Sequence, residues 1–360
     1  MTELHDPIWT GGPTPSDIME EVRGKWVTQR LHPRLPLQIF NYSHKTPPKQ
    51  HWNAVTTVTR GLILDDQWNV VARPFSKFWN LGESNCPAIP DEPFEVYEKM
   101  DGCLGIMYWE DGFPSIATRG SFMSWQALAA TKFIQSIPDG KWDPWMCSSF
   151  STSHTYLFEY IHPNNRIVVD YGNKEQLTLL AIIDTETGTD IPLEIADGSP
   201  LDVVERYDGI SDYNKLSVHD RHNHEGYVIR FQSGLRVKVK HDEYCYLHRL
   251  VTQMTPRVIW ELMRAGAPVD EIIEDAPPQF REWVAERCVE IHRQYQNMEA
   301  TCMSDFLRAP TTRDRKTLAL FFQTCMFPDV LFKMLDQKPY EDIIWKAIKP
   351  EAAEPFRVEV

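Results

Sequence analysis

The sequence lacks the features of a membrane-spanning or secreted protein. A run of about 18 uninterrupted apolar residues, the length that a membrane-spanning helix requires, occurs nowhere in the 360 residues. The first residues contain no basic stretch followed by an apolar one, so we expect no secretory signal peptide. The seven cysteines are scattered and form no Cys-x-x-Cys pair. This pattern indicates reduced thiols in a cytoplasm rather than disulfides or a zinc site.

Positive charge is also scarce. Lys and Arg number 37 against 51 Asp and Glu, and the net charge of −14 argues against a protein that coats nucleic acid without selectivity. A local basic groove is compatible with this charge, because phosphate contacts require only a few well-placed Lys and Arg side chains. Hydrophobic residues make up 42% of the chain, enough for a sizeable core, and the length suggests two domains or one domain with an appendage.

Hydrophobic periodicity changes near residue 245. Residues 1–50 are Pro-rich and irregular, with one expected helix at 16–25. Strands are then expected at 55–64, 70–73, 94–99, 104–109, 156–161, 177–183, 226–231 and 235–239, interrupted by a helix at 124–135 whose Ala127, Leu128, Thr131 and Ile134 share a face. Later segments have a period of about 3.6 residues, at 255–265, 278–297 and 316–323, with Pro256 and Pro278 at helix starts. We predict an α+β fold with mostly antiparallel strands in a first domain, 1–244, followed by an all-helical domain, 245–360.

Lys99 stands two residues before Asp101-Gly102, between two strand-like stretches. The sequence predicts a tight turn at 100–102 that projects Lys99 from the end of a strand, and a hairpin closed by residues 110–112. An isolated K-x-D-G motif also fits an ordinary hairpin with a solvated lysine. The motifs elsewhere in the chain are therefore needed to distinguish a functional lysine from a solvated one.

Charged residues recur in short motifs on both sides of Lys99. They are R-G at Arg60, R-P-x-x-K-F-x-N with Lys77, R-G-S at Arg119, F-E at Glu159, E-G-Y at Glu225, and K-V-K at Lys238 and Lys240. Alternation along a strand places the last two lysines on the same face, where they could bind phosphates or lie in solvent. Glu159 lies within the apolar run YLFEYI, and a carboxylate in such surroundings is rarely buried without a partner.

In this order the motifs resemble those of the tRNA-repair RNA ligases of tailed bacteriophages, ATP-dependent members of the covalent nucleotidyltransferase superfamily. Residues 39–42, I-F-N-Y, are similar to the family's adenylate-contacting tyrosine segment, and P-x-N-R-I-V at 163–168 also matches. Asp314–Thr317 and the apolar helix after it are similar to the family's helical C-terminal domain. The resemblance covers roughly residues 37–325. It implies an antiparallel-sheet adenylyltransferase domain followed by a helical domain that recognises RNA.

The resemblance implies three steps, which are adenylylation of the enzyme, transfer of AMP to a 5′-phosphate RNA end, and attack by a 3′-hydroxyl that expels AMP. Lys99 would be the nucleophile, and neighbouring cations would favour its neutral form, since an ordinary lysine has a pKa of about 10.4. The implied ATP-binding residues are Tyr42, Arg60, Lys77, Gly102, Arg119, Glu159, Glu225, Lys238 and Lys240. Glu225 and Glu159 would hold Mg²⁺, which prefers oxygen ligands, with Mn²⁺ as a substitute.

Two positions depart from the family pattern. Position 119 is Arg where the phage relatives often have Lys, which keeps the charge but changes the geometry of hydrogen bonding. Asp270-Glu271 falls where the family has an acidic pair assigned to a second metal, but a solvated pair at a helix start explains these residues as well.

Two other functions remain open at this point. An mRNA-capping guanylyltransferase shares the lysine chemistry, although a helix rather than a β-barrel is expected after Lys240. A catalytically silent module that binds a nucleotide or an RNA end is the second alternative. For the ligase we expect a monomer in the cytoplasm, or in the host cytoplasm if the source is viral, acting without a membrane on RNA with 5′-phosphate and 3′-hydroxyl ends, such as nicked tRNA. A chain that ends near Tyr244 is expected to retain the lysine chemistry.

Overall fold

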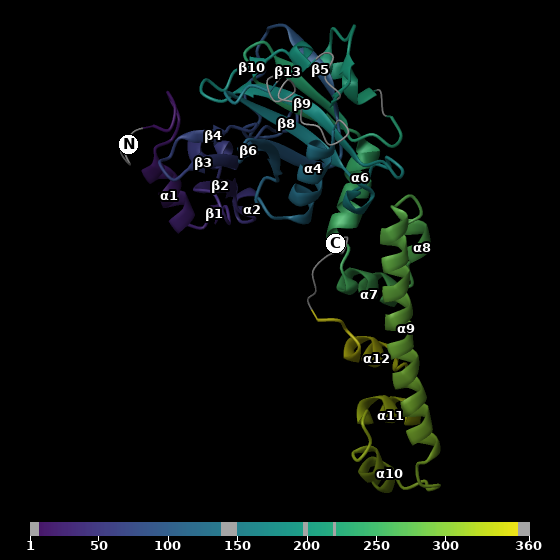
Figure 1. Cartoon of the computed structure of the whole chain (residues 1–360). Helices are drawn as coiled ribbons and strands as arrows, with labels where there is room; N and C mark the ends of the chain where they lie inside the picture. The colour runs from purple at the N-terminus through teal and green to yellow at the C-terminus, as the bar shows by residue number, and fades with distance from the viewer. Residues whose placement is uncertain (1–6, 138–149, 197–200, 219–220, 352–360) are drawn as a thin grey trace. The chain divides into compact units, whose positions relative to one another are not determined.

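The computed structural model describes residues 7–137, 150–196, 201–218 and 221–351 (Figure 1). The chain forms two compact units, an N-terminal unit of Met1–Cys245 and a C-terminal unit of Tyr246–Glu359. The N-terminal unit contains three sheets of almost entirely antiparallel strands, and the described C-terminal unit is helical, so the predicted α+β class is confirmed. The boundary between the units falls within helix α6 (Asp242–Gln253).

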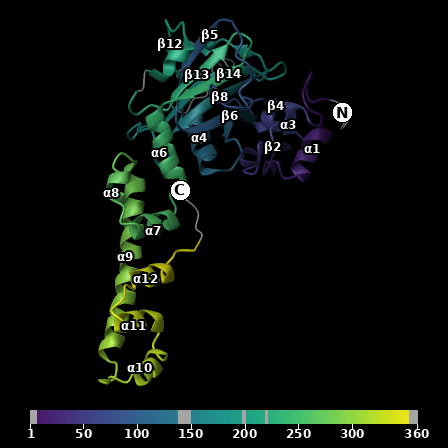
Figure 2. The same ribbon diagram turned by 180° about the vertical axis from the view of Figure 1, so that it is seen from behind.

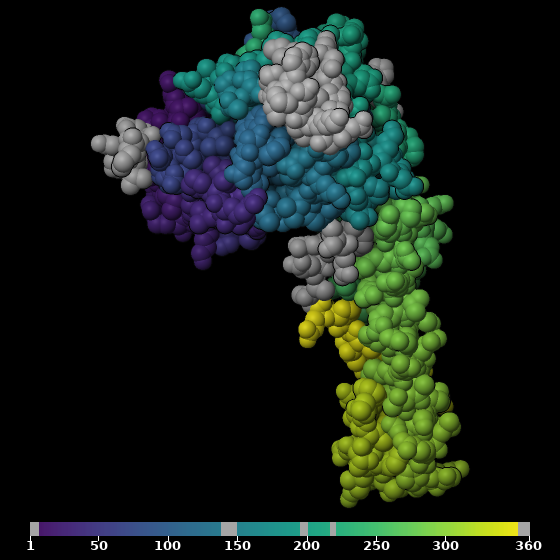
Figure 3. All heavy atoms as spheres, viewed as in Figure 1, coloured from purple at the N-terminus to yellow at the C-terminus, as the bar shows by residue number. Residues whose placement is uncertain are grey.

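The first sheet joins two strands from residues 1–50, which were expected to be mostly irregular, to two strands from stretches expected to be strands. Its strands follow the order β1 (Val27–Leu31), β2 (Leu37–Tyr42), β3 (Arg60–Asp65) and β4 (Val70–Ala72). The expected N-terminal helix is present as α1 (Pro15–Arg23), which Thr14 and Asp17 cap. Ile18 of α1 packs against Phe40 and Leu62 of the sheet. Figure 3 shows these N-terminal residues, in purple, and those that follow, in blue, as one continuous surface.

The strand expected at 55–64 is half wrong. Its first part is a short helix, α3 (Ala54–Val58), and only its second part is strand β3. Asn53 is the cause, because its side chain accepts hydrogen bonds from the N–H groups of Val55 and Thr56 and so caps a helical turn. The cap outweighs the strand preference of these β-branched residues. Another short helix, α2 (Thr46–Lys49), precedes it.

The second sheet forms the centre of the N-terminal unit. Its order is β10 (Asp190–Ile191), β9 (Gln176–Asp184), β8 (His154–Ile161), β6 (Cys103–Glu110) and β7 (Phe113–Ala117), with β11 (Asp202–Val203) parallel to β9. Helix α4 (Trp125–Ser136) is capped by Ser124 and buries Ala127, Ala130 and Ile134 against this sheet. Leu128 is 49% exposed, so the face predicted for this helix was incorrect at that residue.

The third sheet contains Lys99 at the end of a strand. Its order is β12 (Arg206–Tyr207), β5 (Phe94–Lys99), β13 (Gly226–Phe231) and β14 (Arg236–Lys240). Strands β5 and β6 therefore belong to different sheets, and residues 100–102 connect the two sheets instead of forming the turn of a hairpin. The predicted hairpin after Trp109 is correct, since β6 pairs with β7. Short 3₁₀ helices occur at Pro163–Asn165, Leu193–Ala196 and Tyr213–Val218.

The C-terminal unit is organised along one long helix. The remaining helices are α7 (Pro256–Arg264), α8 (Val269–Ile272), the long α9 (Pro278–Leu307), α10 (Arg315–Phe322), α11 (Pro328–Leu335) and α12 (Glu341–Ala347). Helices α7, α11 and α12 pack against α9, which both views show (Figures 1 and 2). Thr255 caps α7, and prolines begin α7 and α9 as predicted. None of the helices in the described residues has the length and apolar character needed to cross a membrane.

Gly226 fixes the register of the third sheet. Its φ of +143° is unfavourable for other residues, and an added Cβ would lie 2.0 Å from the carbonyl oxygen of Val239 on β14. We expect Gly226→Ala to lower the free energy of unfolding by roughly 1–3 kcal/mol or more through overpacking, measured by denaturant titration. Gly120→Ala is the matched control, because its nearest neighbouring atom would be 3.8 Å away. Equal stability of the two variants would contradict this prediction.

Candidate functional site

A buried glutamate lies between two lysines in the third sheet. Strand β13 separates β5 from β14, and its first residue, Gly226, pairs with Lys99 on one side and Lys240 on the other. The residue before it, Glu225, is 4% exposed, and its Oε1 atom lies 2.8 Å from Nζ of each lysine. Burial raises the pKa of the Glu225 carboxyl, but the charges of Lys99 and Lys240 outweigh this effect and lower it below its ordinary value.

Glu159 approaches the same centre from the second sheet. It lies on β8, and its Oε1 atom accepts a hydrogen bond of 2.9 Å from the N–H of Gly102. Burial raises the pKa of Glu159 to about 8, and the charge of Lys99 opposes this rise. Gly102 has no room for a side chain, since a Cβ would lie 2.6 Å from the carbonyl oxygen of Tyr160. The glycine is therefore required by packing against β8, and its expected approach to the nucleotide stays a prediction.

Asp101 is a site residue that the sequence analysis took only as part of a turn. It is 3% exposed, and its Oδ2 accepts hydrogen bonds of 2.9 Å from the N–H groups of Val168 and Val169. Its Oδ1 accepts a hydrogen bond of 2.7 Å from the Tyr244 hydroxyl, and its own N–H donates to the Tyr171 hydroxyl. These bonds fix residues 100–102 and thus the end of the Lys99 strand.

The Tyr244 contact changes the expectation for a shortened chain. Tyr244 lies in the first turn of α6 and is 3% exposed. A chain that ends near Tyr244 would cut through α6 and disturb the support of Asp101. The sequence offered no signal for this contact, because the two residues are 143 positions apart.

Lys238 lies among several cations. Its backbone pairs with the segment after Lys77, through bonds from Lys238 N to Trp79 O (3.0 Å) and from Leu81 N to Lys238 O (2.9 Å). Its Nζ lies 5.6 Å from the ring centroid of Phe78. Burial lowers the pKa of Lys238 to about 7, and the charges of Lys77, Lys99, Lys240 and Arg60 lower it as well.

Aromatic rings hold the other cations that the sequence analysis named. Lys77 Nζ lies 5.4 Å and 4.9 Å from the ring centroids of Trp52 and Trp79. Arg119 Nη1 donates a hydrogen bond of 2.8 Å to the Tyr42 hydroxyl. Arg60 lies 5.9 Å from the ring centroid of Phe78, and burial, followed by the charge of Arg119, lowers its pKa to about 10.

The structure thus brings the predicted residues of the N-terminal unit into one network of contacts and charges. Asp270 and Glu271 belong to the other unit, where both are exposed in the first turn of α8. The described residues contain no group of three or more His, Cys, Asp and Glu side chains arranged to hold a metal ion.

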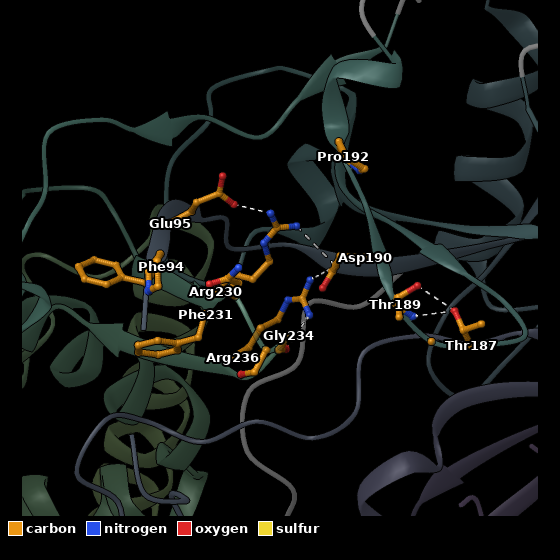
Figure 4. A pocket seen from close by; sticks show the side chains of 14 residues that line it. Phe94, Glu95, Thr187, Thr189, Asp190, Pro192, Arg230, Phe231, Gly234 and Arg236 are labelled. Carbon is orange, nitrogen blue, oxygen red and sulfur yellow. Dashed lines mark hydrogen bonds and ion pairs between the residues drawn. The ribbon is translucent and has the colours of Figure 1, made fainter. Parts of the chain in front are cut away.

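A separate hollow in the N-terminal unit is lined by residues of β5, β10, β13 and β14 (Figure 4). Its two arginines are already paired: Arg230 and Arg236 both contact Asp190, and Arg230 also contacts Glu95. These ion pairs join β10 of the second sheet to the β13–β14 hairpin of the third. We interpret this network as structural.

The lysine–glutamate centre lies within the part of the chain that matches a known family. Residues 58–246 match the model of a family described as RNA ligase, which is more than half of the chain. The chain belongs to this RNA ligase family.

Two viral proteins are among its relatives. It is 24% identical over 278 residues to an RNA ligase of Rhodothermus phage RM378, covering 56% of this chain and 62% of that protein. It is 25% identical over 234 residues to a protein of Autographa californica nuclear polyhedrosis virus, whose name combines polynucleotide kinase and RNA ligase, covering 59% of this chain and 33% of that protein. The chain therefore spans less than two thirds of the length of either relative.

Solved structures of RNA ligases superimpose on the chain with TM-scores below 0.5. An archaeal ATP-dependent RNA ligase superimposes with a TM-score of 0.46 at 14% identity, covering 92% of this chain and 97% of that one. A Naegleria gruberi RNA ligase with pyrophosphate superimposes with a TM-score of 0.35 at 16% identity, covering 44% of this chain and 52% of that one.

The buried charge of Lys238 should reduce the stability of the protein. Its pKa is about 7 in the fold and about 10.4 in an unfolded chain. The unfolded state therefore binds more protons between these pH values, and the cost is fully present below about pH 7 and disappears as the pH rises toward 10.4. We expect Lys238→Met to raise the free energy of unfolding by roughly 1–4 kcal/mol at pH 6, with a smaller gain at pH 9.

The measurement is chemical unfolding of both proteins at the two pH values. Lys132→Met is the control, because Lys132 is an exposed residue of α4, and we expect it to change stability little. A Lys238→Met protein that is less stable than the wild type at pH 6 would show that the lysine charge is not a burden on the fold.

Proposed function

We propose that this protein is an ATP-dependent RNA ligase that acts through a lysyl-adenylate. The observation that carries the proposal is the buried Glu225, which holds Lys99 and Lys240 at 2.8 Å each beside further cations. A cluster of lysines and arginines suits a polyphosphate, since phosphoryl transfer depends mainly on positioning and charge stabilisation. Membership of the RNA ligase family supports the same reaction.

In the first step Lys99 Nζ attacks the α-phosphorus of ATP, so a nitrogen–phosphorus bond forms and pyrophosphate leaves. The contact between Lys99 and Glu225 has to open before the amine can reach phosphorus. Lys238 and Lys240 are assigned to the α-phosphate, and Arg60 and Lys77 to the sugar–phosphate and pyrophosphate. Tyr42 and Arg119, which are hydrogen-bonded to each other, are assigned to the nucleotide.

The two glutamates fit a divalent cation. Burial raises the pKa of Glu159 to about 8, and the nearby carboxylates of Glu225 and Asp101 contribute to this rise. A cation would relieve the repulsion between these groups, and Mg²⁺ prefers carboxylate oxygens and water. We assign Mg²⁺, with Mn²⁺ as a substitute, to Glu225 and Glu159, where it would neutralise phosphate charge when bound. Asp270 and Glu271 stay a weaker prediction for a second metal.

The proposed substrate is RNA with a 5′-phosphate and a 3′-hydroxyl end. AMP passes from Lys99 to the 5′-phosphate, and the 3′-hydroxyl then attacks that phosphate and expels AMP. We assign residues 1–244 to adenylylation and residues 245–360 to recognition of RNA, with nicked tRNA as the substrate and a monomer as the acting species. In the basic cluster near α10, Arg315 pairs with Asp336 at 2.8 Å, and Arg313 and Lys316 are exposed.

The capping alternative is disfavoured by the segment that follows the K-V-K strand. In the described structure, β14 ends at Lys240 and helix α6 begins at Asp242, where a guanylyltransferase of the capping type is expected to continue into a β-barrel.

Labelled ATP with Mg²⁺ should transfer AMP to Lys99, detected on a denaturing gel and located by peptide mapping. Lys99→Ala should abolish the label and leave the fold intact, because the side chain is at the surface of the site and 21% exposed. Glu225→Ala should reduce labelling by about 10²–10³, the effect of removing one electrostatic contact to the transition state. Labelling only from GTP would indicate capping chemistry, and labelling of Lys99→Ala would place the nucleophile elsewhere.

Two shortened chains separate adenylylation from RNA selection. A chain that ends at Gln253 keeps all of α6 and the bond from Tyr244 to Asp101, so we expect it to accept AMP. A chain that ends at His241 lacks Tyr244 and should accept little. The longer chain should lose activity on a tRNA nicked in its anticodon loop more than on an unstructured 5′-phosphate RNA. An equal loss on both RNAs would mean that the C-terminal unit does not select the substrate.

A further inference from the structure

Much of the first sheet comes from a part of the chain that contains no acidic residue. Residues 22–64 include seven Lys and Arg but no Asp or Glu. The whole chain has 51 Asp and Glu in 360 residues, so an average stretch of this length would contain about six of them. Positive charge is therefore concentrated in the segment that forms β1, β2, α2, α3 and most of β3, in a chain whose net charge is −14.

Most of these cations are exposed and have no acidic partner. Arg60 belongs to the proposed nucleotide site, Arg34 pairs with Glu110 at 2.6 Å, and Arg23 lies in the last turn of α1, where it faces the negative end of the helix dipole. The other four are exposed and form no ion pair with any other described residue: Lys25, Arg30, Lys45 and Lys49. We refer to these four residues as the basic surface. Their charge is not used within the fold and is available to a ligand.

A loop that begins and ends in the proposed nucleotide site carries two of the four cations. It starts at Tyr42 and ends at Trp52, and the ring centroids of these residues are 5.1 Å apart. The ring of Trp52 also lies 5.4 Å from Lys77 Nζ. Lys45 and Lys49 stand at the two ends of helix α2 within this loop. Because the rings at its ends are in contact, the loop places both lysines beside the nucleotide site.

The other two cations continue the basic surface along β1, which is an edge strand of the first sheet. The Ser43 hydroxyl donates to the carbonyl oxygen of Lys25 at 2.8 Å and accepts from the N–H of Lys45 at 3.2 Å, so the two lysines are neighbours. Arg30 lies three residues after Val27 on β1, about 10 Å along a strand that rises about 3.3 Å per residue. The four cations are therefore spread along a path and do not surround a single point.

Such an arrangement suits a chain of phosphates. Proteins bind single-stranded nucleic acid without sequence preference through cations that follow the backbone, together with aromatic rings on which bases stack. The net negative charge of the chain would repel RNA from other surfaces. An acidic protein would match the charge of the basic surface as well, but the direct connection of the loop to the nucleotide site favours a strand whose end enters that site.

We propose that the basic surface binds the sugar–phosphate backbone of the RNA strand next to the nucleotide site, without reading its sequence. This inference rests on the proposed function and deepens it. The N-terminal unit would hold the RNA backbone, and the C-terminal unit would select the RNA.

The test measures binding of a single-stranded RNA with a 5′-phosphate to the full chain by fluorescence anisotropy. The titrations are made over a range of salt concentrations and without ATP, so that no transfer occurs. The variants are Lys45→Gln/Lys49→Gln and Lys25→Gln/Arg30→Gln, which change exposed side chains only. Each lost phosphate contact should lower the slope of log affinity against log salt concentration by about 0.7, so we expect each double variant to lose about 1.4 in slope and to bind roughly 10–30-fold more weakly at about 0.1 M salt.

The matched control is Lys132→Gln/Lys174→Gln. It removes the same charge from two exposed positions of the N-terminal unit that lie outside the basic surface, and it should bind RNA as the wild type does. The measurement is repeated with a second RNA of different sequence. Contacts to phosphates weaken binding by the same factor for every sequence, so we expect equal losses with the two RNAs.

Several outcomes would overturn the inference. Unchanged RNA binding by both double variants would do so, and binding of polyglutamate that these variants alone lose would then assign the surface to an acidic protein. An equal loss in the control would indicate a long-range effect of charge, and a loss with only one RNA would indicate contacts to bases. Labelling of Lys99 by ATP requires no RNA, so loss of the label in the double variants would place these cations in the nucleotide site. A wild type that is not labelled, but whose RNA binding depends on the basic surface, refutes only the ligase chemistry.

Discussion

The candidate site depends on one buried carboxylate. Two lysines on neighbouring strands would repel each other, and a buried glutamate without partners would be costly. Glu225 reduces the repulsion between the lysines and gains partners for its own charge, because its Oε1 contacts Lys99 and Lys240 at 2.8 Å each. The geometry follows from the sheet, since Gly226 pairs with both lysines across β5 and β14. The lysine that we propose as the nucleophile and the one that we propose for phosphate binding are thus placed together by the fold itself.

A second constraint links this centre to the neighbouring sheet. Lys99 ends a strand of the third sheet, and Glu159 lies on a strand of the second. Only residues 100–102 separate β5 from β6, so the position of this short connection decides how the two sets of side chains meet. Asp101 holds it through Val168, Val169 and Tyr244, which lie 67, 68 and 143 positions further along the chain. The carboxylate of the K-x-D-G motif therefore acts by fixing the connection.

The charged motifs could be found from the sequence, but the strands, helices and sheets that surround them could be predicted only in part. Lys99, Glu159, Glu225 and Lys240 were singled out by the order of their motifs, which resembles that of a known family, because each motif alone also fits a solvated residue. The tight turn expected at 100–102 is instead a connection between two sheets, because periodicity predicts a strand but not the sheet that it joins. Strand β1 was missed because, apart from Val27, its residues are not buried and show little apolar alternation, and α3 was missed because one capping side chain, Asn53, outweighed local strand preference.

Two regions of the N-terminal unit are rich in cations, the hollow lined by Arg230 and Arg236 and the surroundings of Lys77 and Arg119. They differ in how these four cations are neutralised. Arg230 and Arg236 are paired with Asp190 and Glu95, so their charge is used within the fold. Lys77, by contrast, lies near the rings of Trp52 and Trp79, and Arg119 lies against Tyr42. An aromatic face stabilises a cation without cancelling its charge, which leaves that charge for a phosphate. The first region is therefore suited to holding sheets together, and the second to the polyphosphate that we propose for it. The pKa of Lys238, which burial lowers to about 7, indicates that this arrangement costs stability.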